Sequence, residues 1–348
     1  MSRPPTVSVV VPCYRYGRFL PESVGSALDQ EGVEVRVLVI DDASPDDSFE
    51  VAQQLAAADS RVTARRHKVN RGHIATYNEG LLDWADGDYS VLLSADDVLA
   101  PGALARATGV MAAHPEVGFV YGHAVNWRDD RPRRPARTRP TGVTVWPGRE
   151  WLGIVCRLGH TVVTSPEVVV RTSLQQRVGG YLPELPHTAD VEMWMRLAAH
   201  ADVAYVRGVD QAYYRIHASN MTIERVPLVD LDQRRAAFRA FFEAHGDAVA
   251  DSSRLRRRAE RKIAREALWR ACRAYERRRL DTTPVAELER LAVETYPDAR
   301  RLPEHWGLRW RRVVGGRVAP WLQPFLLAAP YHRLRNWWWW RRWERRGY

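Results

Sequence analysis

The sequence predicts an α/β protein built on a mostly parallel sheet flanked by helices, with a helical extension at the C-terminus. Two observations in the first 125 residues support this class. Short β-branched runs alternate with stretches of helical period, and the strand-like runs are apolar nearly throughout, which is typical of strands buried on both faces. From about residue 226 the pattern becomes helical and rich in arginine.

The strands expected in this first part lie at residues 7–11, 35–40, 62–66, 89–93 and 118–122. Helices are expected between them, within residues 16–30, 44–58, 72–85 and 100–114. A strand, a helix and a further strand in this order form a βαβ unit, so the strands should run parallel. Their carboxyl ends should then border a ligand site at one edge of the sheet.

The chain beyond residue 125 is less regular. Residues 128–142 are rich in Pro and Arg, and we expect a solvated, mobile loop or a lid. A helix is expected over 146–159, a strand over 167–171 and an amphipathic helix over 188–201. These elements complete a first domain, residues 1–225, which we expect to be followed by a basic, Trp-rich helical region, residues 226–348.

Composition limits the class of protein. Of the 348 residues, 45% are hydrophobic and 27% are charged, which excludes a mainly disordered or mainly membrane-embedded chain. The three cysteines match neither a disulfide framework nor a zinc site. No signal-peptide pattern opens the sequence, so we expect a cytoplasmic protein.

The charge is divided unevenly along the chain. Residues 1–225 carry 24 Lys and Arg against 27 Asp and Glu, a net charge of −3, whereas residues 226–348 carry 28 against 15, a net charge of +13. Eight of the 14 tryptophans follow residue 302. The two parts of the chain therefore meet different surroundings.

Polar residues follow three of the expected strands: "PCY" the first, "DDAS" the second and "SADD" the fourth. Adjacent Asp96 and Asp97 raise each other's pKa, and their burial costs free energy unless positive charge or hydrogen-bond donors compensate. A simpler interpretation is a solvated turn that caps the helix after Pro101.

Neither a GxGxxG nor a GxxxxGK[ST] loop is present. A divalent metal held by carboxylates remains as the way to hold a diphosphate.

Four segments resemble the family 2 glycosyltransferases, inverting enzymes with a nucleotide-diphospho-sugar transferase (GT-A) fold: "VSVVVPCYRYGRFLPESVGSAL", "VLVIDDASPDDS", "NRGHIATYNEGL" and "LLSADDVLAP". The resemblance covers residues 7 to about 222. It implies that Pro12 and Tyr14 line the base pocket and that Asp41 and Arg71 contact the base and its ribose. Asp96 would face the ribose or the metal, and Asp97 would be a ligand for Mg²⁺ or Mn²⁺.

The stretch "HTADVEMWMRL" resembles the part of the family that carries a Glu-Asp catalytic pair. The first acid is replaced by Ala189, and Asp190 holds the position of the general base, with Trp194 expected near the acceptor. Glu192 is the second candidate for the base. Asp190 could instead be a helix-start residue favoured by the helix dipole.

The stretch "YYRIHASNMT" resembles the closing segment of the family's site. The resemblance implies that His217 completes the metal or pyrophosphate site and that Arg215 pairs with phosphate oxygens, with Asn220 also matching. A lone histidine is more often structural, so the role of His217 depends on this context.

The resemblance thus implies a metal-dependent transfer from a nucleoside-diphosphate sugar, with a UDP-sugar favoured, to a hydroxyl acceptor that could be lipid-linked, in cell-surface polysaccharide or glycolipid synthesis. Two alternatives remain: a catalytically inactive GT-A-like binding protein, which Ala189 suggests, and a nucleic-acid-binding protein acting through its basic region. No helix-turn-helix, RRM or zinc-finger pattern supports the second, and we do not expect a nucleic acid partner.

The tail, residues 317–348, places Trp337–Trp340 beside several arginines. Prolines break its apolar stretch, which is far short of the roughly 20 residues that span a bilayer. We expect this tail to dock on an anionic membrane surface, which makes the protein peripheral at the inner face of the membrane. Packing on the catalytic domain and a protein interface are the two alternatives.

Overall fold

A computed structural model describes residues 3–217, 219–220, 227–316, 318, 343 and 345–348. Within the described residues the chain forms two compact units. The first, here called the sheet unit, comprises residues 1–151, 162–223 and 344–348, and the second, the helical unit, comprises residues 152–161 and 224–343. The domain boundary expected after residue 225 stays a prediction.

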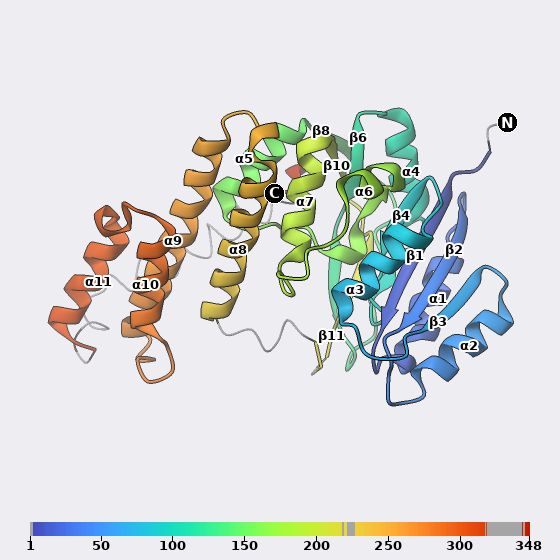
Figure 1. Cartoon of the computed structure of the whole chain (residues 1–348), viewed down its shortest axis with the longest axis horizontal. Coiled ribbons are helices and arrows are strands. Elements are labelled where there is room, and N and C mark those ends of the chain that lie inside the picture. Colours follow the sequence, from blue (N-terminus) through green and yellow to red (C-terminus); the bar gives the residue numbers. More distant parts are fainter. Residues whose placement is uncertain (1–2, 218, 221–226, 317, 319–342, 344) are drawn as a thin grey trace. The chain divides into compact units, whose positions relative to one another are not determined.

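A large mixed sheet forms the centre of the sheet unit (Figure 1). Its strands, in spatial order, are β3 (Val62–Arg66), β2 (Glu34–Asp41), β1 (Thr6–Cys13), β4 (Tyr89–Leu92), β9 (Val169–Arg171), β6 (Val117–Tyr121), β10 (Asp202–Arg207) and β8 (Gly142–Trp146). β1, β2, β3 and β4 pair in parallel, as the βαβ pattern predicts, and so do β6 and β10. β9 is antiparallel to β4 and β6, and β8 is antiparallel to β10.

The helices of this unit are α1 (Leu20–Leu28), α2 (Ser48–Ala58), α3 (His73–Asn78), α4 (Ala103–Ala113), α6 (Thr172–Val178), α7 (Ala189–His200) and the first turn of α5 (Gly148–Leu158). A π-helical stretch, Glu79–Trp84, continues α3. The core lies where the helices cover the sheet, and Val9, Val37 and Leu93 are completely buried there. Each such side chain contributes about 2 kcal/mol to folding.

A small second sheet brings distant segments to the end of β4. It consists of β5 (Val98–Leu99), β11 (Ala212–Ile216) and β7 (Ala124–Arg128), in that order. β11 is antiparallel to β5 and parallel to β7. Because β5 follows the Asp96–Asp97 pair directly, β11 lies beside that pair although it is more than 100 residues away in sequence.

The Pro/Arg segment, residues 128–142, makes long-range contacts that the sequence did not predict. Arg134 and Arg137 form ion pairs with buried Asp210, both at 2.9 Å, and the backbone N of Arg137 also donates to Asp210. The hydroxyl of Tyr213 donates to the backbone oxygen of Arg134 at 2.7 Å. These acceptors and donors are more than 70 residues away in sequence, so no local pattern marks them.

The last residues of the chain pack on the sheet unit. The hydroxyl of Tyr121 donates to the backbone oxygen of Gly347 at 2.7 Å, and the ring of Tyr348 lies 5.2 Å from that of Trp146. Gly347 has a φ of 77° and lies so close to Tyr121 and Tyr205 that a Cβ would not fit. Residues 345–348 therefore belong to this unit, whereas Trp337–Trp340 lie outside the described residues.

The helical unit contains α8 (Pro227–His245), α9 (Ser252–Glu276), α10 (Val285–Thr295) and α11 (Pro303–Val314) (Figure 1). α9 packs against the other three helices through small residues such as Ala259, Ala264 and Ala267, which are fully buried. Within the described part of the chain, no helix is both long and apolar enough to cross a membrane.

Candidate active site

A cleft of about 750 Å³ lies at the carboxyl ends of β1, β2 and β4. The three parallel strands end at the same edge of the sheet, so the residues that follow them meet there. Of the predicted site residues, those that line the cleft are Pro12, Tyr14, Asp96 and Asp97. Tyr14 is 45% exposed, as expected for a side chain that faces open solvent at the mouth of a cleft.

Asp96 and Asp97 are both buried at the floor of this cleft. Burial raises the pKa of Asp96, and an interaction with His217 opposes the shift. Burial, together with the neighbouring charge of Asp96, raises the pKa of Asp97 well above its usual range. The pair therefore lacks full compensation for its negative charge from the described side chains, which favours a bound cation at this position.

His217 and Asn220 complete one side of the pair. Nε2 of His217 lies 3.0 Å from Oδ2 of Asp96, and Nδ2 of Asn220 donates to the same oxygen at 3.3 Å. Asn220 also donates to the backbone oxygen of Arg215, so it links Asp96 to β11. The histidine expected at the metal or pyrophosphate thus contacts a carboxylate that lines the cleft.

Arg215 lies beside the pair but does not line the cleft. Its backbone N donates to Oδ1 of Asp97 at 2.9 Å, and its Nε donates to the backbone oxygen of Asp96 at 2.6 Å. The two terminal nitrogens of the guanidinium pair with Asp129 and Glu22. The phosphate contact implied for Arg215 therefore stays a prediction, and the contacts present make it a support for Asp96 and Asp97.

Of the acidic pair after β2, Asp42 lines the cleft and Asp41 does not. Asp41 is fully buried, accepts a hydrogen bond from the Ser44 amide at 3.1 Å and lies 3.4 Å from Nε of Arg66. Asp42 accepts from the backbone N of Arg71 and of Gly72, both at 2.8 Å, and thereby holds that loop against the cleft.

Arg71, predicted to contact the base and its ribose, directs its guanidinium to Glu79 at 2.7 Å and is not a cleft-lining residue. Glu79 also lies 3.0 Å from Nε2 of His67, whose Nδ1 lies 2.6 Å from Asp42. The pattern "DDAS" marked this corner of the site, and the contacts to base and ribose expected for Asp41 and Arg71 stay predictions.

α7 carries the residues that were expected to act on the acceptor. Asp190 is half-buried in its first turn, where its Oδ1 accepts from the amide of Val191 at 2.8 Å. Trp194 is 1% exposed and packs against Phe119 and Tyr181, with ring centroids 5.8 and 6.4 Å away. The structure places Trp194 in the core, so its expected position near the acceptor stays a prediction.

The neighbours of Asp190 on α7 do not share its setting. Ala189 is buried and offers no polar group. Glu192, the second candidate for the base, is 1% exposed and forms an ion pair with Arg196 at 2.7 Å. Because that pair lies inside the protein, Asp190 remains the better candidate for the base on α7.

Tyr77 is a cleft residue that the sequence reasoning missed. Its ring packs edge-on against those of His73 and Tyr181, with centroids 5.4 and 5.7 Å away. Burial raises the pKa of Tyr77, and the charges of Asp96 and Asp190 add to the shift. Tyr77 therefore lies within electrostatic reach of both acids. The spacing of His73 and Tyr77, one helical turn apart in "NRGHIATYNEGL", could have pointed to this aromatic face.

The residues at Asp96–Asp97 fit a hard divalent cation in their chemistry, since carboxylate oxygens are the ligands preferred by Mg²⁺ and Mn²⁺. Among the described residues, no group of three or more His, Cys, Asp and Glu side chains is arranged to hold a metal by itself. The protein would therefore contribute few ligands, as is usual when Mg²⁺ is bound together with substrate phosphates.

Residues 8–163 match the family described as Glycosyl transferase family 2. An uncharacterized protein of Mycobacterium tuberculosis is 26% identical over 216 residues, which are 58% of this chain and 65% of that protein. An uncharacterized glycosyltransferase of Nostoc sp. is 23% identical over 299 residues, 82% of this chain and 88% of that protein. The chain thus spans just under two thirds of the Mycobacterium relative and most of the Nostoc relative.

Solved structures share the fold at low sequence identity. TarS 1-349 of S. aureus in complex with UDP-GlcNAc superposes with a TM-score of 0.65 at 15% identity, covering 90% of both chains. The mannosyltransferase PcManGT of Pyrobaculum calidifontis, in complex with GDP-Man and Mn²⁺, has a TM-score of 0.54 at 18% identity, covering 96% of this chain and 88% of that one. Residues 8–163 thus match the family 2 glycosyltransferases, and the chain has a GT-A fold like that of these solved structures.

Proposed function

We propose that this protein is an inverting glycosyltransferase that moves a sugar from a nucleoside diphosphate to an acceptor hydroxyl. The observation that carries the proposal is the buried Asp96–Asp97 pair on the floor of a cleft at the carboxyl ends of parallel strands. Two solved structures with the same fold hold nucleotide sugars, UDP-GlcNAc in TarS and GDP-Man in PcManGT. We favour a UDP-sugar as the donor, the class that TarS holds in its solved complex.

In this proposal Tyr14 and Pro12 contact the base, and Asp96 and Asp97 face the ribose and the diphosphate. Mg²⁺ or Mn²⁺ held by Asp97 would neutralise charge on the departing nucleoside diphosphate. Asp190 takes the proton from the acceptor hydroxyl, which attacks the anomeric carbon on the face opposite the leaving group. One such displacement inverts the anomeric centre. Arg215 and His217 keep the Asp96–Asp97 pair in place through the contacts described above.

The test is release of UDP from UDP-sugars, measured with and without MnCl₂ on the wild type and on Asp97→Asn. We expect activity to require the metal, and Asp97→Asn to lose most of it because the carboxylate that binds the cation is gone. Asp190→Asn should still bind donor while kcat falls by a factor on the order of 10². Asp83→Asn, an exposed position outside the cleft, is the control expected to act like wild type.

Full activity in excess EDTA would contradict the metal-dependent mechanism. Loss of activity in Glu192→Gln with normal activity in Asp190→Asn would move the base to Glu192. Binding of UDP without any turnover across a panel of sugars and acceptors would favour the alternative of a catalytically inactive binding protein.

We further propose that the basic C-terminal region docks on an anionic bilayer, where a lipid-linked acceptor of a cell-surface polysaccharide or glycolipid is presented. Most of the tail lies outside the described residues, so the support comes from α11. Trp306, Trp310 and Val313 lie on one face of this helix and are 62%, 47% and 88% exposed. Arg309 lies over the ring of Trp306. Exposed tryptophan beside arginine, in a region of net charge +13, suits an anionic headgroup layer.

The membrane proposal predicts that the full chain sediments with vesicles containing anionic lipid. Trp306→Ser combined with Trp310→Ser, or deletion of residues 317–348, should reduce this, and roughly 0.5 M salt should weaken it by screening. Trp269→Ser, which removes an exposed tryptophan from α9, is the matched control. Equal sedimentation of all variants, or none by the wild type, would refute docking.

A further inference from the structure

Arg215 contacts both residues of the Asp96–Asp97 pair. Its backbone N donates to Oδ1 of Asp97 at 2.9 Å, and its Nε donates to the backbone oxygen of Asp96 at 2.6 Å. The side chain is only 5% exposed, so it has little freedom to shift without moving its partners. The backbone position of Asp96 therefore depends in part on where the guanidinium of Arg215 is fixed.

Two acids outside the cleft fix that guanidinium. Asp129, just after β7, pairs with Nη1, and Glu22, in the first turn of α1, pairs with Nη2. The rings of Phe19 and Trp127 lie 4.6 and 4.2 Å from Cζ of Arg215. A planar guanidinium with carboxylates at both terminal nitrogens and aromatic rings against it has a defined orientation.

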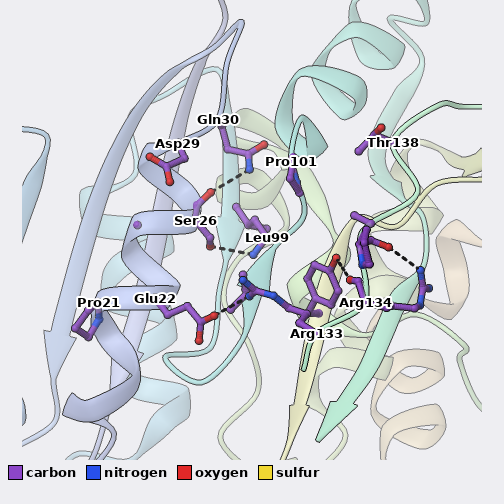
Figure 2. A pocket seen from close by; sticks show the side chains of 15 residues that line it. Pro21, Glu22, Ser26, Asp29, Gln30, Leu99, Pro101, Arg133, Arg134 and Thr138 are labelled. Atoms are coloured by element: carbon purple, nitrogen blue, oxygen red, sulfur yellow. Dashed lines mark hydrogen bonds and ion pairs between the residues drawn. The ribbon is translucent and has the colours of Figure 1, made fainter. Parts of the chain in front are cut away.

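The same cluster includes the Pro/Arg segment through Arg133. Nη1 of Arg133 lies 2.8 Å from Oε1 of Glu22, while Oε2 of Glu22 faces Arg215. Arg133 also lies over the rings of Trp127 and Tyr213. Figure 2 shows Glu22 and Arg133 facing each other in the wall of a second cavity, of about 660 Å³. Glu22 is thus shared between Arg133 and Arg215.

We infer that Asp129 and Glu22 are positioning residues for the donor site, which act through Arg215 to keep Asp96 and Asp97 available for the nucleoside diphosphate and its metal. The inference rests on the proposed function. Neither acid lines the cleft, so neither reaches the donor directly. With Asp129 or Glu22 neutralised, the buried guanidinium keeps only one of its two carboxylate partners, so its orientation is less firmly fixed. A shift of the guanidinium would move its Nε away from the backbone oxygen of Asp96 and so displace the pair that faces the metal.

Two adjacent acids provide a matched test. Asp129→Asn removes a partner of buried Arg215. Asp130→Asn removes the same charge one residue later. The Asp130 side chain is 60% exposed, and its ion-pair partner among the described residues is Arg128, at 3.4 Å. We expect Asp129→Asn to weaken UDP binding in the presence of MnCl₂ roughly tenfold or more, measured by calorimetry on the full chain. Asp130→Asn should bind like wild type, and Asp129→Glu should recover most of the affinity.

A second variant separates positioning from folding. Glu22→Gln changes a helix-surface acid that is 40% exposed, and it should weaken UDP–Mn²⁺ binding in the same direction while the urea midpoint stays near that of wild type. Wild-type affinity for UDP with Mn²⁺ in both Asp129→Asn and Glu22→Gln would overturn this inference and leave the proposed function standing. Equal weakening by Asp129→Asn and Asp130→Asn would also overturn it, as a general charge effect. A wild-type chain that binds no UDP with Mn²⁺ would refute the proposed function and the inference together.

Discussion

The sheet unit and the helical unit contain arginine pairs of opposite exposure. In the sheet unit, Arg196 and Arg215 are buried and each meets carboxylates that lie inside the protein or at its edge. In the helical unit, Arg239 is 70% exposed and pairs with Glu243 one turn away, and Arg254 is 78% exposed and pairs with Asp251 just before α9, although Arg234 is buried there and pairs with Asp230 and Glu266. Burial restricts the guanidinium of a buried arginine to a single arrangement with its acid. The guanidinium of an exposed arginine can bind water instead.

This difference also explains the uneven charge along the chain. In the sheet unit a buried cation must be matched by an acid, and the near balance of 24 basic and 27 acidic residues over residues 1–225 is consistent with that requirement. Exposed arginines need no such match, which is consistent with the excess of 13 positive charges over residues 226–348. The excess is then available for an anionic partner.

The largest effect that the comparison predicts is the loss of a buried pair. Arg196→Met removes the partner of Glu192, together with hydrogen bonds from Arg196 to the backbone oxygens of Val178 and Gly180, both at 2.7 Å. Burial already raises the pKa of Glu192, so an isolated carboxylate there is costly. We expect the free energy of unfolding to fall by about 3 kcal/mol, measured by urea denaturation.

The helical unit offers a matched control with the same spacing. Arg239 and Glu243 are also four residues apart on one helix, at 2.8 Å, but are 70% and 50% exposed. Arg239→Met should change the free energy of unfolding by only about 0.3–0.5 kcal/mol, and less in high salt. Similar losses in Arg196→Met and Arg239→Met would contradict the distinction between buried and exposed arginine pairs.

Local sequence patterns predicted the parts of the fold and site that depend on neighbours in sequence. The strands around Val9, Val37 and Val91 follow from apolar β-branched runs, and the Asp96–Asp97 pair follows from its place directly after such a run. The amphipathic pattern of residues 188–201 predicted the face that contains Trp194, which is buried. The acceptor contact that the resemblance implies for Trp194 stays a prediction.

Long-range partners could not be predicted in this way. Arg215 meets Glu22 and Asp129 across 193 and 86 residues, and no spacing along the chain indicates either contact. The Pro/Arg segment had the composition of a solvated loop. Its Arg134 and Arg137 nevertheless form ion pairs with Asp210, which lies just before β11. A one-residue choice was equally hidden: only the backbone geometry after β2 decides that Asp42, and not Asp41, lines the cleft.

Glu167 sharpens the comparison because it is a buried acid of the sheet unit without an ion-pair partner among the described residues. Its Oε1 accepts a hydrogen bond from the amide of Thr164 at 2.8 Å. Burial nevertheless raises the pKa of Glu167 to about 8, and the hydrogen bonds oppose the shift only in part. The group is therefore largely protonated in the folded protein near neutral pH, whereas it is ionised in the unfolded chain.

This raised pKa fixes the sign of the pH dependence. The folded state binds the proton more tightly than the unfolded state, so the stability that Glu167 contributes is fully present below about pH 4.5 and is lost as the pH rises toward about 8. Glu167→Gln removes the ionisation while keeping a carbonyl oxygen for the Thr164 amide. We expect the variant to gain stability relative to wild type between pH 5 and pH 8.5, by on the order of 2 kcal/mol in free energy of unfolding.

Urea denaturation of both proteins at several pH values in this window measures the gain. Glu116→Gln is the control with the opposite sign: Glu116 is exposed, and hydrogen bonds, with His114 among the partners, lower its pKa, so this variant should gain nothing as the pH rises. A constant difference between wild type and Glu167→Gln at all pH values would mean that Glu167 ionises normally inside the protein. A cationic partner would then have to reach it, and the distinction between acids paired with arginine and acids kept neutral by burial would fail in this unit.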